Sequence, residues 1–284
     1  MVLAAIWYWY LLPLAVVAVA MIGRRTIRAL VKKAISVRDD GSRPLNLRQR
    51  VLLRYQNYSF TPFMFAWCKT RQDPMFQEFP ELLEPVGPIK SFLDLGCGFG
   101  FAASYLLEMF PDSQVYAVEP SRRRVAVAKL ALGDRGHVFQ GAAPDFENPS
   151  LPDRFEAVFA IDMLHYLDDK ALDVTLSRLR ARLHDGHYLI IRAPMKPEDS
   201  GSLLWKLTRI HATAWGLFAQ YRTVEQLRRH IAGAGFHVER SQISGKNPEL
   251  HWFISRAVPL EEKVERLVLE PVPAVGDDRK QHHA

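Results

Sequence analysis

The glycine-rich stretch SFLDLGCGFGFA, residues 91–102, constrains the fold of this chain more than any other feature. The apolar residues before Asp94 predict a short buried strand, and those after Gly100 predict a helix. Glycines at every second position let the chain turn tightly between the two, and they let a ligand approach the backbone closely. The stretch therefore predicts a strand–turn–helix unit with a ligand seated against the turn.

Residues 91–258 alternate between strand-like and helix-like segments, which predicts an α/β fold with a parallel sheet. Further strands are expected at residues 114–119, 137–141, 155–162 and 186–194, with helices at 101–110, 121–132, 170–183 and 223–235. Residues 236–244 and 250–258 have the length of two antiparallel strands joined by a GKNP turn. We therefore expect a seven-stranded, Rossmann-like sheet with a C-terminal antiparallel hairpin at its edge.

A carboxylate follows the glycines at the spacing expected for a nucleoside pocket. Glu119 ends the second predicted strand, 19 residues beyond Gly100, where a carboxylate can accept hydrogen bonds from both hydroxyls of a ribose. The Asp-x-Gly-x-Gly-x-Gly spacing differs from the Gly-x-Gly-x-x-Gly pattern of dinucleotide sites, and no GxxxxGKS/T phosphate loop is present. Asp94 adds a second carboxylate near the turn, which suits a cationic nucleoside better than a pyrophosphate.

Four stretches taken together resemble motifs of a known family. FLDLGCGFG, VYAVEPS, FEAVFAIDMLHYLDD and LHDGHYLIIRAP are similar, in this order, to the successive motifs of class I S-adenosylmethionine-dependent methyltransferases that act on small molecules. The resemblance covers residues 91–257. It implies a Rossmann-like methyltransferase sheet, S-adenosyl-L-methionine as the cofactor, and methyl transfer as the reaction.

The resemblance also implies which positions bind the cofactor. The glycine turn would surround the methionine and ribose, Glu119 would hold the ribose hydroxyls, and Pro120 would flank the adenine. Family members often have an acid after the third strand that contacts the adenine amine, but Ala142 stands there, so the Ala143 backbone or Asp145 are the alternatives. The full implied set is Asp94, Gly96, Cys97, Gly98, Gly100, Glu119, Pro120, Ala143, Asp162 and Met163.

His165 is the candidate general base. It lies three residues beyond Asp162, in a loop at the carboxyl edge of the predicted sheet, where ligands of open α/β folds bind. A hydroxyl acceptor gains from a base that removes its proton, but a histidine that only packs in this loop is the alternative. The sequence has no CxxC or HExxH pattern and only two cysteines, Cys68 and Cys97, so we predict no metal site and no disulfide framework.

Residues 2–23 form an uncharged, apolar run long enough to cross a bilayer as a helix. A basic stretch follows at once, so the positive-inside rule predicts a single-pass membrane protein whose catalytic domain is cytoplasmic. A cleaved signal peptide, with the small residues Ala18 and Ala20 near its cleavage site, is one alternative, and a buried core helix is another. No positive charge precedes the run, and it exceeds the usual signal-peptide core, so we favour the anchor.

The net charge of +6 belongs to one region of the chain. Residues 24–54 contain ten basic and two acidic side chains, so the rest of the chain is slightly acidic. Nucleic-acid-binding proteins usually carry basic residues across a face of their fold, so we expect no nucleic-acid partner. Residues 24–38 predict a basic amphipathic helix suited to anionic lipid, although a simple charged flank of the anchor fits equally well.

The predicted domain organisation has five parts. A transmembrane anchor (1–23) precedes a basic juxtamembrane helix and linker (24–54), an aromatic-rich helical lid (55–90), the methyltransferase domain (91–258) and a partly disordered tail (259–284). Six aromatic residues of the lid are candidates for an apolar substrate channel or for ordinary core packing, namely Tyr55, Tyr58, Phe60, Phe63, Phe65 and Trp67. A second candidate wall is residues 203–223.

The function predicted from these features is methyl transfer, mainly to oxygen, on a lipophilic small molecule or lipid-linked metabolite at the cytoplasmic membrane face. A nucleotide-dependent oxidoreductase is an alternative, against which the glycine spacing and the final hairpin argue. A non-catalytic partner subunit that retains the fold is a second alternative, which Ala142 permits and the intact glycine turn and Glu119 oppose.

Overall fold

The computed structural model describes residues 25–39, 41, 43–196 and 219–259. The predicted anchor, nearly all of the tail and most of the second candidate wall therefore lie outside the described residues. Among the residues that are described, we find no helix with the length and apolar character needed to cross a bilayer.

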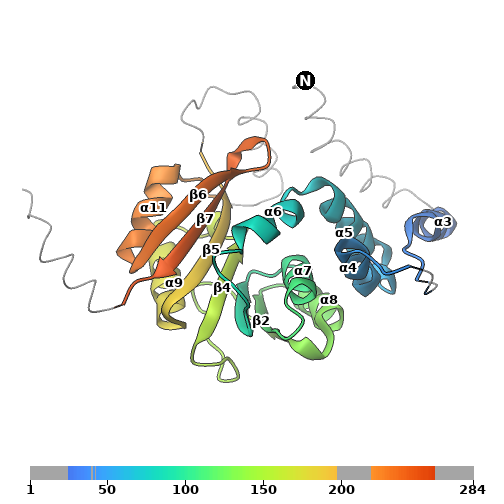
Figure 1. Ribbon diagram of the computed structural model, residues 1–284, viewed down its shortest axis with the longest axis horizontal. Helices are drawn as coiled ribbons and strands as arrows, with labels where there is room; N and C mark the ends of the chain where they lie inside the picture. The colour runs from blue at the N-terminus through green and yellow to red at the C-terminus, as the bar shows by residue number, and fades with distance from the viewer. Residues whose placement is uncertain (1–24, 40, 42, 197–218, 260–284) are drawn as a thin grey trace, which may run out of the picture.

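A seven-stranded sheet forms the centre of the protein (Figure 1). Its strands follow the order β3-β2-β1-β4-β5-β7-β6, with β1 to β5 parallel and β7 antiparallel to both β5 and β6. The mixed sheet with a C-terminal hairpin confirms the fold predicted from the sequence. The strands are β1 (Ser91–Leu95), β2 (Gln114–Glu119), β3 (Gly136–Gln140), β4 (Phe155–Ile161), β5 (Leu183–Pro194), β6 (Phe236–Ser244) and β7 (Asn247–Ala257).

The strand order reverses between β1 and β4, because β1 connects outward to β2 while the chain later returns to pair β4 on its other side. Ligands of open α/β sheets bind in the crevice that this reversal leaves at the carboxyl ends of the strands. The topology therefore places a binding site beside the glycine-rich turn.

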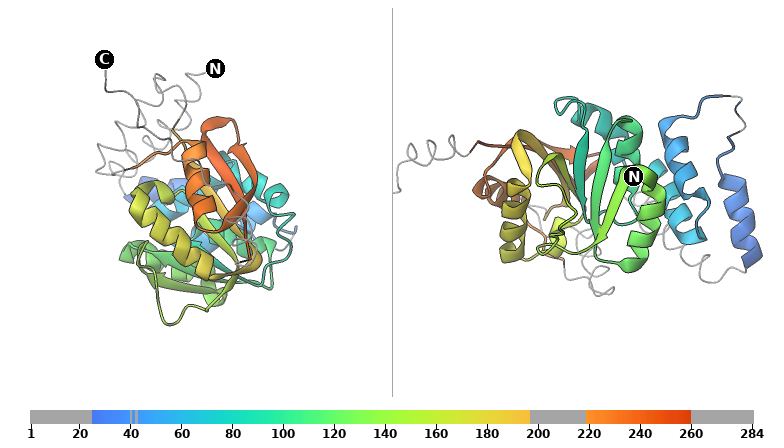
Figure 2. Two further views of the ribbon diagram at one scale, coloured as in Figure 1. Left: turned by 90° about the vertical axis from the view of Figure 1, so that its left-hand side faces the viewer. Right: turned by 90° about the horizontal axis from the view of Figure 1, so that it is seen from below.

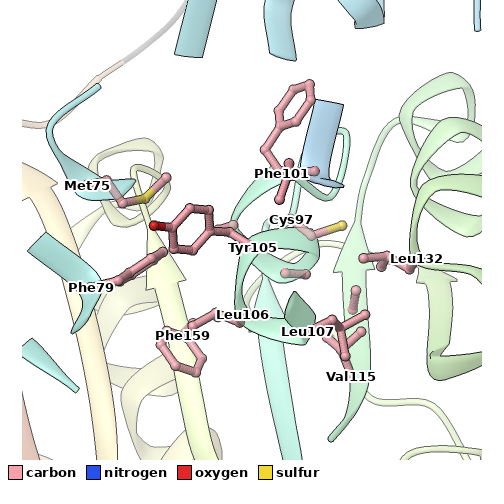
Figure 3. Packing of buried hydrophobic residues seen from close by; sticks show 14 of the residues in the cluster. Met75, Phe79, Cys97, Phe101, Tyr105, Leu106, Leu107, Val115, Leu132 and Phe159 are labelled. Atoms are coloured by element: carbon pink, nitrogen blue, oxygen red, sulfur yellow. The ribbon is translucent and has the colours of Figure 1, made fainter. Parts of the chain in front are cut away.

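Helices cover both faces of the sheet, because successive strand residues point to opposite sides. Phe92 of β1 belongs to the cluster on one face, and the next residue, Leu93, belongs to the cluster on the other. Figure 3 shows part of the first cluster, where Leu106 lies near Phe159 and Tyr105 lies near Phe79. The first face carries α7 (Phe101–Met109) and α8 (Arg122–Leu132), and the second carries α9 (Asp169–Ala181) and α11 (Val224–Gly233).

Within the described residues, four helices precede the sheet, and three of them join the first face. They are α3 (Arg25–Ile35), α4 (Leu47–Gln56), α5 (Phe60–Gln72) and α6 (Met75–Leu82). Arg50 and Arg54 of α4 both bind Glu108 of α7, with Nε–Oε distances of 2.7 and 2.9 Å. The helix α4 thus runs across residue 54, the predicted boundary between linker and lid, and it is anchored to the sheet domain.

The predicted basic amphipathic helix corresponds to α3, which lies at the outer end of the molecule beyond α4 and α5 (Figure 2). Val31 and Ile35 pack against the core, and Lys32 donates a 2.7 Å hydrogen bond to the carbonyl of Tyr58. Leu30, in contrast, is 62% exposed. Part of the apolar surface of α3 is therefore occupied by α5, and part remains accessible.

Candidate active site

A cavity of about 890 Å³ lies at the carboxyl ends of β1, β2 and β4. One part of its wall comes from the glycine turn after β1, the end of β2 and the loop after β3. Another part comes from α5 and from the segment after β4. Nine of the ten positions predicted to bind a cofactor line this cavity; Gly100 does not, since a Cβ there would meet the Ala128 side chain at 3.3 Å.

The turn after β1 has a backbone that only glycine adopts readily. The φ angles of Gly96, Gly98 and Gly100 are +76°, +59° and +80°, in the left-handed region. A Cβ added to Gly96 would lie 2.9 Å from the Cβ of Met163, so the turn and the segment after β4 are in close contact. A Cβ added to Gly98 would meet no atom within 4 Å, which leaves that backbone open to a ligand.

Glu119 lies directly against this turn, as its spacing in the sequence predicts. Its Oε2 accepts a 3.0 Å hydrogen bond from the Gly98 amide, and its Oε1 accepts 2.9 Å and 3.3 Å bonds from the Ser121 amide and Arg124. The side chain is only 2% exposed, yet it contributes to the cavity wall. Since a carboxylate offers about four acceptor positions, it retains capacity for a ligand hydroxyl.

Asp94 is a buried carboxyl group that lacks a partner for one of its oxygen atoms. It is 1% exposed, and its Oδ2 has no hydrogen-bond partner among the described residues. Burial, together with the nearby charge of Glu119, raises the pKa of Asp94 to about 7. A buried carboxylate is stabilised by a cation. The sulfonium and ammonium groups of S-adenosylmethionine are such cations, and its ribose hydroxyls match Glu119, so the residues present fit this cofactor.

The adenine side of the predicted site is formed by short side chains. Pro120, Ala142 and Ala143 line the cavity there. Asp145 does not line it; its carboxylate is 83% exposed and binds Arg178 at 2.7 Å. Of the two alternatives for the missing acid, only Ala143 therefore lies at the cavity.

Cys97 lies in the glycine turn. Burial, with the charges of Asp94 and Glu119, raises the pKa of the Cys97 thiol, which suits a small packing side chain and not a reactive thiolate.

Asp162 lies at the end of β4 in a left-handed conformation, with φ at +55°. Its carboxylate binds the guanidinium of Arg192, a residue of β5 that is 1% exposed and also lines the cavity. Although burial opposes it, the charges of Arg192 and Lys69 lower the pKa of Asp162, so this carboxylate is ionised at neutral pH. Lys69 and Arg192 were not anticipated from the sequence: Lys69 lies outside the four family-like motifs, and Arg192 lies within LHDGHYLIIRAP but had no predicted role.

His165 is close to the cavity but does not form its wall. Tyr166 and Leu167 line the cavity, whereas the ring of His165 packs with its centroid 4.0 Å from that of Tyr166 and 5.9 Å from that of Tyr221. Burial lowers the pKa of His165 to about 4, so the imidazole is neutral at pH 7. Its Nδ1 has no partner within the described part of the chain. Its assignment as a general base stays a prediction.

The helix α5 supplies a further part of the cavity wall. Thr61, Phe65 and Lys69 line the cavity at a spacing of four residues, so they lie on one face of the helix. Phe65 is 43% exposed, and its ring stacks on that of Phe101 with centroids 5.0 Å apart. Of the six candidate channel aromatics, only Phe65 lines the cavity; Tyr55 and Phe63 are fully buried in the core.

Residues 92–186 match the protein family described as "Methyltransferase domain". The chain therefore contains a methyltransferase domain. It is 28% identical over 178 residues to an uncharacterized methyltransferase of Bacillus mycoides, in a match covering 60% of the chain and 81% of the relative. It is also 30% identical over 135 residues to an uncharacterized protein of Synechococcus sp.; that match covers 46% of the chain and only 28% of the relative.

Solved structures share the fold of this chain. The pyocyanin biosynthetic protein PhzM aligns with a TM-score of 0.55 and 19% identity, over 70% of this chain and 58% of PhzM. A S-adenosylmethionine-dependent methyltransferase from Mesorhizobium loti aligns with a TM-score of 0.53 and 19% identity, over 66% and 99% of the two chains. The mitomycin 7-O-methyltransferase MmcR aligns with a TM-score of 0.51 and 15% identity, over 75% and 67%. At these identities the likeness establishes the fold.

Proposed function

We propose that this protein is a methyltransferase that uses S-adenosyl-L-methionine and transfers the methyl group to an oxygen of a lipophilic small molecule or lipid-linked metabolite. The observation that carries the cofactor assignment is the contact between Glu119 and the Gly98 amide, with the unpartnered Asp94 carboxyl on the same cavity. These groups match a ribose and a cation held side by side. A pyrophosphate, in contrast, would bring two further negative charges toward two carboxylates.

The bound cofactor would supply a methyl group activated by a positively charged sulfur. Glu119 would hold the ribose, Gly96 and Gly98 would pack against the ligand with their bare backbone, and Asp94 would face its positive charge. These contacts fix the position of the reactive group, and alignment of two reactants in one site is a major source of rate acceleration. The aromatic wall would exclude water.

The α5 side of the cavity supports the proposed class of acceptor. Phe65, Phe99 and Phe101 form an aromatic group there, with ring centroids 5.0–6.0 Å apart. Lys69 lies over the Phe65 ring, with its Nζ 6.0 Å from the ring centroid, and both Lys69 and Asp162 are engaged in ion pairs. An apolar, uncharged acceptor therefore suits this surface better than a charged one. The likeness of the fold to MmcR, whose name describes a 7-O-methyltransferase, supports oxygen as the methylated atom.

We further propose that residues 2–23 anchor the enzyme in a membrane and that the folded part works at the cytoplasmic face. The support is the uncharged length of this segment and the basic stretch that follows it. The exposed Leu30 and the lysines of α3 would then lie near anionic headgroups. A lipophilic acceptor would reach the cavity from the bilayer.

Binding of S-adenosylhomocysteine and of NAD to the full chain, measured by isothermal titration calorimetry, tests the cofactor. We expect saturable binding of S-adenosylhomocysteine and none of NAD; the opposite result would support an oxidoreductase.

Mass spectrometry of lipid extracts from cells with and without the protein tests the acceptor. We expect a lipophilic compound heavier by 14 daltons, the mass of one CH₂, only in cells that contain the protein.

A further inference from the structure

A buried group of charges connects the α5–α6 junction to the cavity. Arg192 of β5 makes two bidentate ion pairs. Its Nε and Nη2 donate to the carboxylate of Asp162, and its Nη1 and Nη2 donate to the carboxylate of Asp73. The Nε–Oδ1 distance to Asp162 is 2.9 Å, and the Nη2–Oδ2 distance to Asp73 is 2.8 Å. Asp73 and Arg192 are 4% and 1% exposed, so water screens this group little.

Asp162 is the point at which this group reaches the cofactor side of the cavity. Its amide donates a 2.8 Å hydrogen bond to the carbonyl of Arg192, so both its backbone and its side chain are held by one residue of β5. Its φ of +55° is uncommon for a residue other than glycine, and such conformations persist only where the surroundings fix them. The next residue, Met163, packs against Gly96 of the ligand-binding turn.

Asp73 lies at the other end of the group and does not line the cavity. It ends α5, its Oδ1 accepts a 3.0 Å hydrogen bond from the Met75 amide at the start of α6, and its Oδ2 accepts a 2.7 Å bond from Lys69. The carboxylate therefore holds both helices of the lid segment as well as Arg192. Its loss would leave the buried Arg192 with Asp162 as its one carboxylate partner among the described residues.

We propose that Asp73 and Arg192 are positioning residues, through which the α5–α6 junction sets the place of Asp162 and Met163 and hence the affinity for the cofactor. The inference rests on the proposed function, because the ligand is the proposed cofactor. It differs from a purely structural role in one respect: Asp73, which does not touch the cavity, is expected to control binding within it.

A second carboxylate of the lid provides a matched control. Glu78 of α6 accepts 2.7 Å hydrogen bonds from Trp252 Nε1 and Ser244 Oγ, and a further bond from the Gly245 amide. It therefore ties the same lid to the sheet, but to the β6–β7 turn rather than to the end of β4. Glu78 does not line the cavity either. Asp73→Asn and Glu78→Gln thus each remove one charge from a lid carboxylate.

The test compares the two variants in the full chain. Both are expected to lower the melting temperature, because each leaves buried donors with a weaker acceptor. Asp73→Asn should also weaken S-adenosylhomocysteine binding by about tenfold or more, as loss of an outer support of a binding site commonly does, whereas Glu78→Gln should leave it within about twofold. In the ligand-free protein, hydrogen exchange of the amides at residues 162–167 should accelerate in Asp73→Asn but not in Glu78→Gln.

A second measurement needs only the wild-type protein, in case Asp73→Asn fails to fold. S-adenosylhomocysteine should slow hydrogen exchange at residues 70–74, which do not line the cavity, but not at the β6–β7 turn. Wild-type binding with equal affinities in both variants, or with no added protection at 70–74, would overturn the positioning role alone. Absence of wild-type binding would overturn the proposed function and this inference together.

Discussion

Among single residues, we expect Glu119 to contribute most to the affinity for the proposed cofactor. Replacing it with alanine removes the acceptor of the Gly98 and Ser121 amides as well as the proposed partner of the ribose. Hydrogen bonds to a charged group contribute about 1.5–3 kcal/mol each, so loss of two should weaken S-adenosylhomocysteine binding at least about a hundredfold. Titration calorimetry checks this, with the exposed Glu84→Ala as control; unchanged binding in Glu119→Ala would refute the assignment.

Asp94 makes a pH-dependent prediction. Burial and the charge of Glu119 raise its pKa to about 7 in the ligand-free protein, from an ordinary value of about 3.9. The ammonium group of S-adenosylhomocysteine prefers the ionised carboxylate, so the affinity for this ligand should fall below pH 7, by up to about tenfold per unit. Titrations between pH 6 and 8 should show this slope in the wild type and a flat profile in Asp94→Asn. Parallel profiles would contradict the role.

The ionisation of Asp94 should also make the stability of the ligand-free protein depend on pH. Its folded-state pKa lies above the unfolded value, so between pH 4 and 7 the folded state binds more protons and becomes less stable as the pH rises. The melting temperature of the wild type relative to Asp94→Asn should therefore decrease from pH 5 to pH 7. A rising difference would mean that the carboxylate has a cationic partner without the ligand.

The predicted site residues that the structure brings together are those whose geometry is set locally. The glycines, Asp94 and Glu119 stand at the ends of two adjacent strands, so their spacing fixes their proximity once the strands pair in parallel. Arg192 and Asp73 are 119 residues apart, and only the packing of the lid onto β5 brings them together. The position of His165 beside the cavity likewise depends on how its loop folds after β4, which no spacing specifies.

At the scale of elements, the pairing of α4 with α7 should stabilise the protein without affecting the ligand. Glu108 binds Arg50 and Arg54 and lies outside the cavity wall, so Glu108→Gln should cost about 1–2 kcal/mol of unfolding free energy and leave S-adenosylhomocysteine binding unchanged. Although burial opposes it, these arginines lower the pKa of Glu108, so the difference should shrink as the pH falls below about 4. Urea unfolding at pH 7 and at pH 3 measures both effects.

The elements of the sheet were predictable because their signals are short-range. Turn and cap residues mark their ends, as at Thr223, whose hydroxyl accepts a 3.2 Å bond from the Gln226 amide at the start of α11. The role of α4 was not predictable, because it follows from ion pairs with Glu108, more than fifty residues away. In the same way, a basic amphipathic pattern predicts α3 but does not reveal that Val31 and Ile35 pack on the protein.

At the scale of the whole molecule, the proposed anchor and the folded domain should be separable. Deleting residues 1–24 should leave S-adenosylhomocysteine binding intact, because all the predicted cofactor-binding positions lie between residues 94 and 163, and it should release the protein from washed membranes. Sedimentation and titration of the truncated protein measure the two properties. Continued association with membranes would assign the attachment to α3 or to another protein instead of the apolar segment.

The proposed function depends on Glu119 and the glycine turn binding one ligand together. The most direct measurement is a crystal structure of the full chain, or of the chain lacking residues 1–24, grown with S-adenosylhomocysteine. We predict both ribose hydroxyls within about 3 Å of the Glu119 carboxylate and the ammonium group facing Asp94. A ligand bound elsewhere, or a ribose without contact to Glu119, would contradict the account.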